Sequence, residues 1–311
     1  MPLAQTFPGT TRFTGHKGAV YALTAAAVPG AFFSAGGDGT VVRWDLSDPG
    51  NGMAVAQGER AIFALQRAAH GLLVFGDEDG GLHVLDLDRR EEVQLERAHV
   101  KGIFAITELP DGRLVIAAGD GTISVWTLDA NSRFSLQRKI PLSNDKVRGL
   151  ALDPSGQMLA VACGDGSIHI LNAADLNEQH TLPGHDIGAN SLAWHPSKPV
   201  LVTGGKDGHL RLWRSDDGFR PLHAFPAHKD TLYAIAFSPD GHHLASASRD
   251  KSAKLWDAGT FDPLRKLDRS AGGHGYSVNA LLWAGPHSLL TASDDKAIVQ
   301  WNVPAPDMGT E

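Results

Sequence analysis

Short segments in which apolar and polar residues alternate recur along the whole chain, and each of them ends in a bulky apolar residue. Clear examples occupy residues 40–44, 122–126, 209–213 and 252–256. Alternation with a period of two is typical of half-buried β-strands, because successive side chains of a strand point to opposite faces of its sheet. The pattern predicts an all-β protein of short strands, and the 35 glycines and 17 prolines suit the many tight turns that such strands need.

An aspartate stands just before each of these segments and recurs seven times, at intervals of 41 to 45 residues. Glycine follows it in five copies, which suits a hairpin turn that requires a positive φ. The interval matches that of four-stranded propeller blades and exceeds that of helical or leucine-rich repeats. We therefore expect seven blades. The seven turn aspartates are Asp38, Asp79, Asp120, Asp165, Asp207, Asp250 and Asp295.

A histidine lies 27 or 28 residues before a tryptophan in five of the seven copies. The pairs are His16 and Trp44, His99 and Trp126, His185 and Trp213, His228 and Trp256, and His274 and Trp301. Three of the histidines follow glycine, and two of the tryptophans precede aspartate, so that these copies run from GH to WD. The combination resembles the WD40 repeat family, and the resemblance covers residues 10–303. It implies a seven-bladed WD40 β-propeller with four antiparallel strands in each blade.

The resemblance also implies a structural role for these histidines. In WD40 proteins the motif histidine, a serine or threonine of the second strand, the turn aspartate and the tryptophan of the third strand form a hydrogen-bonded tetrad. Four sets are complete: His16/Ser34/Asp38/Trp44, His185/Thr203/Asp207/Trp213, His228/Ser246/Asp250/Trp256 and His274/Thr291/Asp295/Trp301. We expect them to be buried networks and not hydrolytic triads, whose serine must face a substrate.

Blades two, three and four depart from this pattern. At the histidine, hydroxyl and tryptophan positions, blade two has Glu59, Phe75 and Leu85, and blade four has Asn144 or Asp145, Val161 and Leu171. We expect apolar packing to replace the polar network in both. Blade three keeps its histidine, aspartate and tryptophan but has Ile116 in place of the hydroxyl, so fewer buried hydrogen bonds are expected there.

The two ends of the repeat array predict how the ring closes. The seventh copy ends at residue 303 after three strands, whereas residues 5–13 precede the first histidine without strands of their own. We expect this N-terminal segment to supply the outermost strand of blade seven. The chain is then a single propeller domain over residues 1–311 that ends in a loose tail at 304–311. The expected blades cover residues 14–57, 58–98, 99–144, 145–184, 185–227, 228–272 and 273–303 plus 5–13.

The composition narrows the classes of protein to consider. Hydrophobic residues at 42% and charged residues at 20% are ordinary for a folded domain. The single cysteine, Cys163, allows no intrachain disulfide and no CxxC metal motif, which favours a reducing compartment and predicts no metal or cofactor. Residues 1–9 lack the features of a secretory signal, and no apolar run could span a bilayer, so we expect a cytoplasmic protein with no membrane partner.

The charge distribution changes this picture only slightly. The net charge of −7 gives no sign of a basic stripe for nucleic acid. Acidic residues outnumber basic ones about twofold in residues 45–131, whereas residues 185–272 carry a small basic excess. Solvated surface charge accounts for such an asymmetry, although it could also orient a partner.

The surface that the repeat does not need for itself suggests a function. In WD40 proteins the residue five beyond the motif histidine points toward the top face and the central channel. Here these positions hold Tyr21, Phe63, Phe104, Arg148, Asn190, Tyr233 and Asn279. The residues before the turn aspartates are expected on the same face: Gly37, Glu78, Gly119, Gly164, Lys206, Arg249 and Asp294. The aromatic side chains match the composition of interface hot spots, the cations lie beside Tyr233, and the glycines leave room for a partner.

We therefore predict a noncatalytic scaffold or adaptor, monomeric by itself, that binds a protein or peptide through this top face. One alternative is that the aromatic residues only pack against one another at the channel mouth. Another is a propeller hydrolase or lyase with a site in the central channel, although the sequence contains no HExxH, nucleophile elbow or phosphate-binding loop. The pair His242 and His243 is expected to face solvent beside a turn.

Overall fold

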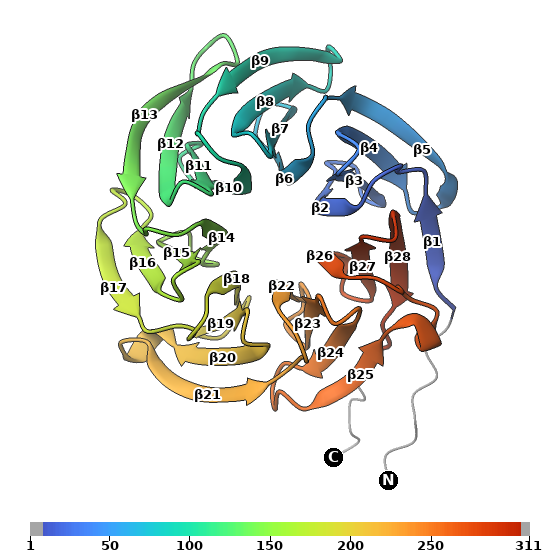
Figure 1. Ribbon diagram of the computed structural model, residues 1–311, viewed down its shortest axis with the longest axis vertical. Coiled ribbons are helices and arrows are strands. Elements are labelled where there is room, and N and C mark those ends of the chain that lie inside the picture. The colour runs from blue at the N-terminus through green and yellow to red at the C-terminus, as the bar shows by residue number, and fades with distance from the viewer. Residues whose placement is uncertain (1–8, 306–311) are drawn as a thin grey trace.

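Each alternating segment of the sequence forms the third strand of a four-stranded antiparallel sheet. The computed structural model describes residues 9–305, and these form seven such sheets arranged in a ring. Figure 1 shows the first strand of every sheet next to the central axis and the fourth strand at the circumference. The seven-bladed propeller predicted from the repeat is confirmed.

The strands of each blade follow one another along the chain, except in blade seven, which also includes β1. Their bounds are as follows: β1 (Thr11–Thr14); β2 (Val20–Ala25), β3 (Ala31–Gly36), β4 (Thr40–Asp45) and β5 (Asp48–Gln57) in blade one; β6 (Ile62–Arg67), β7 (Leu72–Asp77), β8 (Gly81–Asp86) and β9 (Glu91–Arg97) in blade two; β10 (Ile103–Glu108), β11 (Leu114–Ala118), β12 (Thr122–Leu128) and β13 (Phe134–Pro141) in blade three; β14 (Val147–Leu152), β15 (Met158–Cys163), β16 (Ile168–Asn172) and β17 (Glu178–Leu182) in blade four; β18 (Ala189–Trp194), β19 (Val200–Gly205), β20 (His209–Arg214) and β21 (Arg220–Pro226) in blade five; β22 (Leu232–Phe237), β23 (His243–Ser248), β24 (Ala253–Asp257) and β25 (Pro263–Leu267) in blade six; β26 (Val278–Gly285), β27 (Ser288–Ser293) and β28 (Ala297–Asn302) in blade seven. Two short 3-10 turns, η1 (Ser215–Asp217) and η2 (Arg269–Ala271), complete the described elements.

The ring closes through the N-terminal strand, as expected. Strand β1 pairs antiparallel with β28, so that Thr11 lies opposite Gln300 and Thr14 lies opposite Ala297. The predicted closing segment began at residue 5, and its residues 5–8 lie outside the described part of the chain, as do residues 306–311 of the predicted tail. Because β1 pairs with the outer edge of β28, this third strand of blade seven has a neighbouring strand on both sides.

The turns between the second and third strands have the backbone conformation that the repeat predicted. Gly39 lies at φ 70°, and the corresponding glycines of blades two to five also have positive φ. A Cβ atom at Gly39 would lie 2.4 Å from the carbonyl oxygen of Gly58, so close approach of the next strand also favours glycine there. Lys251 and Lys296 occupy the same left-handed position at φ 70° and 66° in the last two blades.

The hydrophobic core of the described residues is divided among the seams between neighbouring blades. At the closing seam, for example, Phe32 and Trp44 of blade one pack with Leu290 and Ile298 of blade seven and with Phe13 of β1. Phe13 is fully buried, and its ring centroid lies 5.2 Å from that of Phe32 in an edge-to-face contact. The core of the described residues therefore consists of separate apolar clusters, one at each seam between neighbouring blades.

Candidate binding surface and the polar networks beneath it

All four predicted tetrads are present. In blade one, the Trp44 indole donates to Ser34 Oγ at 2.8 Å, Ser34 Oγ lies 2.7 Å from His16 Nε2, and His16 Nδ1 lies 3.0 Å from Asp38. An indole N–H can only donate, so the serine hydrogen points to Nε2 and the Nδ1 hydrogen points to the carboxylate. Blades five, six and seven repeat these contacts at distances between 2.8 and 3.2 Å, through the sets His185/Thr203/Asp207/Trp213, His228/Ser246/Asp250/Trp256 and His274/Thr291/Asp295/Trp301.

The hydroxyl groups of the tetrads are closed off from solvent, and burial disfavours the charged form of two of the tetrad histidines. The hydroxyl-bearing residues are 0% exposed, so no serine or threonine of a tetrad can face a substrate. Burial lowers the pKa of His185 and of His228, because desolvation disfavours the imidazolium more than the neighbouring carboxylate favours it. These sets connect the strands within blades one, five, six and seven.

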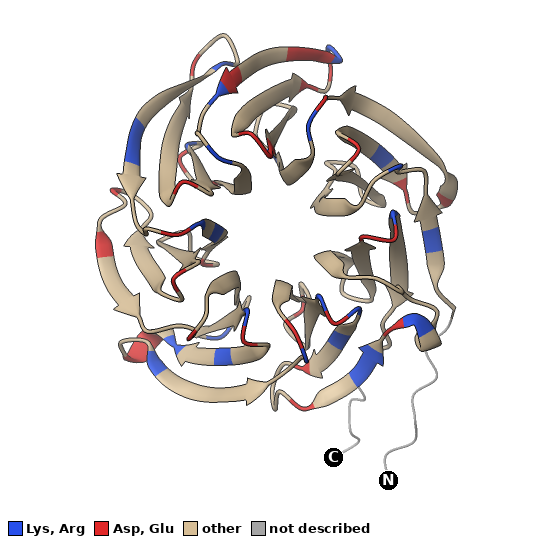
Figure 2. Cartoon of the chain, in the orientation of Figure 1, with Lys and Arg blue, Asp and Glu red and all other residues tan. Residues whose placement is uncertain are grey.

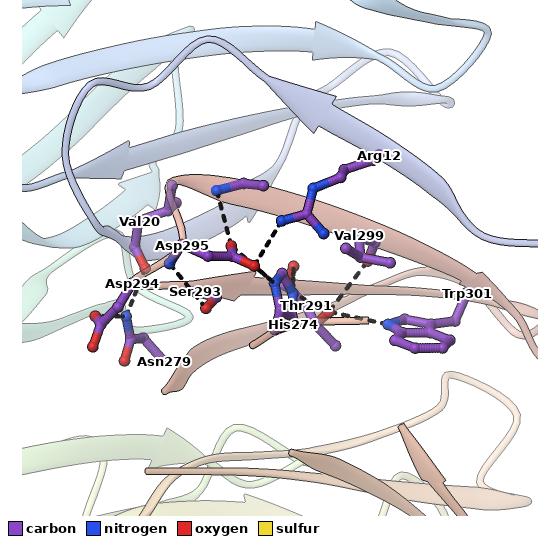
Figure 3. A network of polar contacts seen from close by, with 11 residues as sticks. Arg12, Val20, His274, Asn279, Thr291, Ser293, Asp294, Asp295, Val299 and Trp301 are labelled. Carbon is purple, nitrogen blue, oxygen red and sulfur yellow. Dashed lines mark hydrogen bonds and ion pairs between the residues drawn. The ribbon is translucent and has the colours of Figure 1, made fainter. Parts of the chain in front are cut away.

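Blade seven extends its tetrad to the closing strand. Figure 3 shows the side chains of Arg12 and His274 both reaching the carboxylate of Asp295, with an Arg12 Nη2 to Oδ2 distance of 2.6 Å. Burial acts to raise the pKa of Asp295, but the hydrogen bond from His274 and the ion pair with Arg12 outweigh it and lower that pKa to about 2. Polar contacts as well as apolar ones therefore close the ring.

Blade three has a complete network, contrary to the expectation from Ile116. Ser124 of β12 supplies the hydroxyl instead, with its Oγ 2.7 Å from His99 Nε2 and 2.8 Å from the Trp126 indole nitrogen. Ile116 and Ser124 are register partners on adjacent strands. The hydroxyl has therefore moved across the ladder to the neighbouring strand, and Ser124, two residues before Trp126, was the available sequence signal.

Blades two and four pack Phe75, Leu85, Val161 and Leu171 in apolar clusters, as expected, and each also has part-buried polar contacts on its third strand. His83 of β8 lies 2.6 Å from Glu92 and 3.2 Å from Asp77, and its ring stacks on Phe75 with centroids 4.6 Å apart. In blade four, His169 of β16 lies 2.8 Å from Glu178. In the strand register, His83 lies opposite Phe75 and His169 lies opposite Val161. Phe75 and Val161 are the apolar residues at the hydroxyl position of their blades. In all three divergent blades the polar group thus lies on the third strand.

The seven predicted top-face positions share one structural feature: each is the extra residue of a β-bulge. The register of the first strand shifts at every one of them, between its first and third residues. A bulge residue is left out of the ladder, so its side chain is aimed away from the regular alternation. We call this set the bulge ring, and it consists of Tyr21, Phe63, Phe104, Arg148, Asn190, Tyr233 and Asn279.

Three aromatic members of the bulge ring form a continuous row across blades one to three. Phe63 makes an edge-to-face contact with Tyr21 at 5.2 Å between centroids and stacks on Phe104 at 5.6 Å with an interplanar angle of 16°. The Arg148 guanidinium lies 4.3 Å from the Phe104 centroid, and the Lys146 ammonium lies 5.8 Å from it. All three rings are half-buried. Tyr233, on blade six, contacts no other aromatic ring within residues 9–305.

The two asparagines of the bulge ring connect neighbouring blades. Asn190 Nδ2 donates to the Leu232 carbonyl of blade six at 3.0 Å, and Asn279 Nδ2 donates to the Val20 carbonyl of blade one at the same distance. Asn279 also donates to Asp294, as Figure 3 shows. Two buried polar atoms of the ring, Arg148 Nε and Asn190 Oδ1, have no hydrogen-bond partner in the described part of the chain.

The residues before the turn aspartates lie beside the bulge ring, but their glycines do not provide open space. A Cβ atom at Gly119 would lie 3.0 Å from the Phe104 ring, and one at Gly37 would lie 3.4 Å from the Tyr21 ring. Gly119 therefore leaves room for the Phe104 ring, whereas a Cβ atom at Gly37 would make only an ordinary contact with Tyr21. Lys206 is half-buried, and Arg249 is exposed with its guanidinium 3.9 Å from Asp230.

Three exposed apolar residues of the loops that enter the first strands were missed by the sequence analysis. They follow the motif histidines of blades three, five and seven by one or two positions and are Val100, Ile187 and Tyr276, with 69%, 60% and 61% of their surfaces exposed. A large apolar residue in an otherwise polar loop was the available signal.

The structure corrects one of the histidine expectations and offers no metal cluster in its described part. His243 is buried at 5% exposure and stacks on Trp283, whereas only His242 faces solvent. No group of three His, Cys, Asp or Glu residues within 9–305 is arranged to hold a metal ion. The same residues contain no helix long and apolar enough to cross a membrane.

Comparison with known proteins agrees with this geometry. Five segments, which together make up more than half of the chain, match the family described as "WD domain, G-beta repeat": residues 8–45, 91–127, 176–214, 219–257 and 262–302. The stretches between them hold the first three strands of blades two and four, where histidine and tryptophan are replaced. A further match, over residues 113–186, is to the "Anaphase-promoting complex subunit 4 WD40 domain".

The chain is also similar to several curated proteins over part of their length. It is 24% identical to WD repeat-containing protein 1 of Rattus norvegicus over 156 residues, which are 50% of this chain and 25% of that protein. It is 30% identical to WD repeat-containing protein srw1 of Schizosaccharomyces pombe over 51% of this chain and 28% of that protein. Striatin-3 of Homo sapiens is 29% identical over 40% of this chain and 18% of its own length. The matches thus span less than a third of each of these relatives, and the chain itself belongs to the WD40 family.

Proposed function

We propose that this protein is a noncatalytic scaffold that binds a protein or peptide partner through the bulge ring. The observation that carries the proposal is the row of Tyr21, Phe63 and Phe104. Side chains that interact across two blade seams and keep part of their surface exposed form a rigid platform, so binding requires little ordering on the propeller side. Aromatic residues and arginine are also the side chains most enriched in interface hot spots.

The polar members of the bulge ring suggest how a partner would be oriented. Arg148 lies on Phe104 with its Nε atom unpaired, and Asn190 presents an unpaired Oδ1 on the adjacent blade. A partner that supplies an acceptor to the guanidinium and a donor to the amide would satisfy both buried atoms. Lys206 and Arg249 add positive charge on the same side, which favours an acidic segment there.

The alternative of a hydrolase or lyase in the central channel has no specific support. The histidines that the sequence offers as general bases are members of the tetrads and are buried within them. We further propose that the propeller is monomeric by itself, acts in the cytoplasm and binds neither nucleic acid nor membranes. The net charge of −7 and the buried single thiol of Cys163 agree with this proposal.

The test is affinity capture with the intact protein and with a triple variant, Tyr21→Ala, Phe63→Ala and Phe104→Ala. We expect the variant to lose specific partners that the intact protein retains, while both remain folded. The matched control changes three exposed leucines of the outer strands, Leu136→Ala, Leu222→Ala and Leu264→Ala, and should retain the partners.

Circular dichroism melting of all three proteins separates lost binding from lost folding. Equal capture by the intact protein and the folded aromatic variant would contradict the proposal. Equal loss of partners in the aromatic variant and in the leucine control would do the same, because it would show that the bulge ring has no special role.

A further inference from the structure

The seam between blades one and two carries a groove on the outside of the ring, away from the bulge ring. One part of it has a volume of about 410 Å³ and is walled by Val28, Met53 and Val55 of blade one and by Leu85 and Leu87 of blade two. A second part of about 480 Å³ shares Val55 and Leu85 with the first. We call the two parts together the seam groove. Figure 1 shows the strands that border it, β5 and β8, in neighbouring blades.

The groove has a sequence cause in the residue that blade two holds at the tryptophan position. In blade one, Trp44 fills the space beneath the fourth strand so closely that a Cβ atom at Gly52 would lie 2.4 Å from the indole. Blade two has Leu85 at this position, and a leucine side chain is much smaller than an indole. The apolar wall is consequently open to solvent, with Val28 60% and Met53 46% exposed.

Charge at the edge of the first part favours an acidic occupant. Arg43 of β4 and Arg90 of the β8–β9 turn both line it, and neither makes a hydrogen bond or ion pair in the described part of the chain. Asp88 is the one carboxylate of that lining, so the edge carries a net positive charge. The second part is lined by Glu59, Asp77 and Glu92 as well as by Arg60 and Arg90, so carboxylates outnumber cations there and disfavour an acidic occupant.

We propose that the seam groove binds a short peptide segment of a partner protein in which apolar side chains are followed by acidic residues. The apolar side chains occupy the space between β5 and β8, where an indole would otherwise lie. The carboxylates pair with Arg43 and Arg90, and the acidic lining of the second part fixes the direction of the peptide. This surface is separate from the bulge ring, so the scaffold has two independent places for partners.

The experiment uses fluorescein-labelled synthetic peptides with two leucines followed by two aspartates, in a panel where the spacing of the leucines varies. Anisotropy measures their affinity for the full chain, and methyl NMR locates binding through the methyl groups of Val28, Met53 and Leu85. We expect at least one peptide to bind with shifts confined to these methyls. Replacing its leucines by serine or its aspartates by lysine should weaken binding by about tenfold or more.

Variants of the protein provide the decisive comparison. Leu85→Trp places an indole in the groove and should abolish binding, whereas Leu171→Trp, at the same repeat position of blade four, should not. Because a new indole could impair folding, the exposed pair Val28→Ser and Met53→Ser serves as a second variant and should weaken binding about tenfold at an unchanged melting temperature. Arg43→Glu should weaken binding of the acidic peptide and strengthen binding of its lysine counterpart.

Three results would overturn the proposal. The first is that no member of the panel binds saturably. The second is that peptides bind but shift methyls of the bulge-ring strands instead of those of the seam groove. The third is that sedimentation shows concentration-dependent self-association that Met53→Ser abolishes, because the groove would then hold a second copy of this chain.

Discussion

The indole N–H of each motif tryptophan determines the direction of the hydrogen bonds in its blade. It can only donate, so the hydroxyl beside it must donate onward to the histidine, and the histidine must donate to the turn aspartate. The network tolerates a change in the origin of the hydroxyl, because Ser124 of β12 provides in blade three what Ser34 of β3 provides in blade one. At the residue scale, the position of the oxygen atom matters more than the strand from which it comes.

This interchangeability gives a prediction for blade three. Ser124→Ala removes the acceptor of Trp126 and the partner of His99, so it should lower the free energy of unfolding by about 1–3 kcal/mol. Ile116→Ser returns a hydroxyl from the opposite strand but also removes a fully buried side chain, so Ser124→Ala should cost less when it is added to Ile116→Ser than when it is made alone. Urea denaturation measures both, with the exposed Ser135→Ala as a control that stays within about 0.5 kcal/mol. An equal cost of Ser124→Ala in the native protein and in the Ile116→Ser variant would show that the two positions are not equivalent.

The tetrad histidines also predict how stability depends on pH. Burial lowers the pKa values of His99, His185 and His228, so the unfolded chain binds protons at these residues at a higher pH than the native protein. Stability is therefore complete above the unfolded histidine pKa of about 6.5 and falls as the pH drops below it. Asp250, whose pKa is lowered mainly by hydrogen bonds from His228 and Ser252 against the opposing effect of burial, adds a second loss below about pH 4.

The measurement is the urea midpoint between about pH 7 and pH 5. In this range only the histidine contribution should appear, and His228→Gln should reduce the slope although it lowers stability overall. His242→Gln, at an exposed position, should leave the slope unchanged. A midpoint that rises on acidification would contradict the neutral, buried state of these histidines.

At the scale of the elements, β1 determines whether the ring is closed. It covers the edge of β28, contributes the fully buried Phe13 to the seam with blade one, and pairs Arg12 with Asp295. Deleting residues 1–14 should therefore destabilise the protein and expose β28 to pairing with other copies. Sedimentation at increasing concentration should show self-association, whereas a variant lacking only residues 1–8 should not. A monomeric product with an unchanged melting temperature would show that β1 is dispensable.

The fold was predictable because its signals are local and repeated. The turn aspartates, the alternating third strands and the motif tryptophans each lie within one hairpin, and seven copies reinforce one another. Features that depend on contacts between strands were not predictable in the same way. Ser124 could replace the hydroxyl at position 116 only because the register places the two residues opposite each other, and the opening left by Leu85 exists only once β5 of the neighbouring blade is in place.

At the scale of the whole molecule, charge and apolar surface are distributed unevenly around the ring. Figure 2 shows acidic positions along β9 and basic positions along β25 and η2, on distant parts of the circumference. Three aromatic members of the bulge ring lie in blades one to three, whereas Arg148, Lys206 and Arg249 lie in blades four to six. If the bulge ring binds a partner, as proposed, this distribution favours a partner with an apolar part beside an acidic one.

The aromatic row leads to a prediction that compares Phe63, at its centre, with Tyr233, which lies outside the row. Phe63 contacts an aromatic ring on either side, and such pairs contribute about 0.5–1.5 kcal/mol each beyond burial. Phe63→Ala should therefore cost about 1–3 kcal/mol, between the value for an exposed residue and the 3–5 kcal/mol of a fully buried aromatic residue. Tyr233 is half-buried and contacts no other aromatic ring in the described part of the chain, so Tyr233→Ala should cost about 1 kcal/mol or less.

Urea denaturation of these two variants distinguishes a binding platform from rings that only pack against one another at the channel mouth. If the rings only seal the channel mouth, Phe63→Ala should cost as much as a core aromatic residue such as Phe13→Ala, measured alongside it. If the row is a platform, the Phe63 variant remains well folded, and any partner that depends on the row dissociates faster from it than from the Tyr233 variant. Equal losses of stability for Phe63→Ala and Phe13→Ala would assign the row to packing, because a side chain that costs so much to remove has little surface left for a partner.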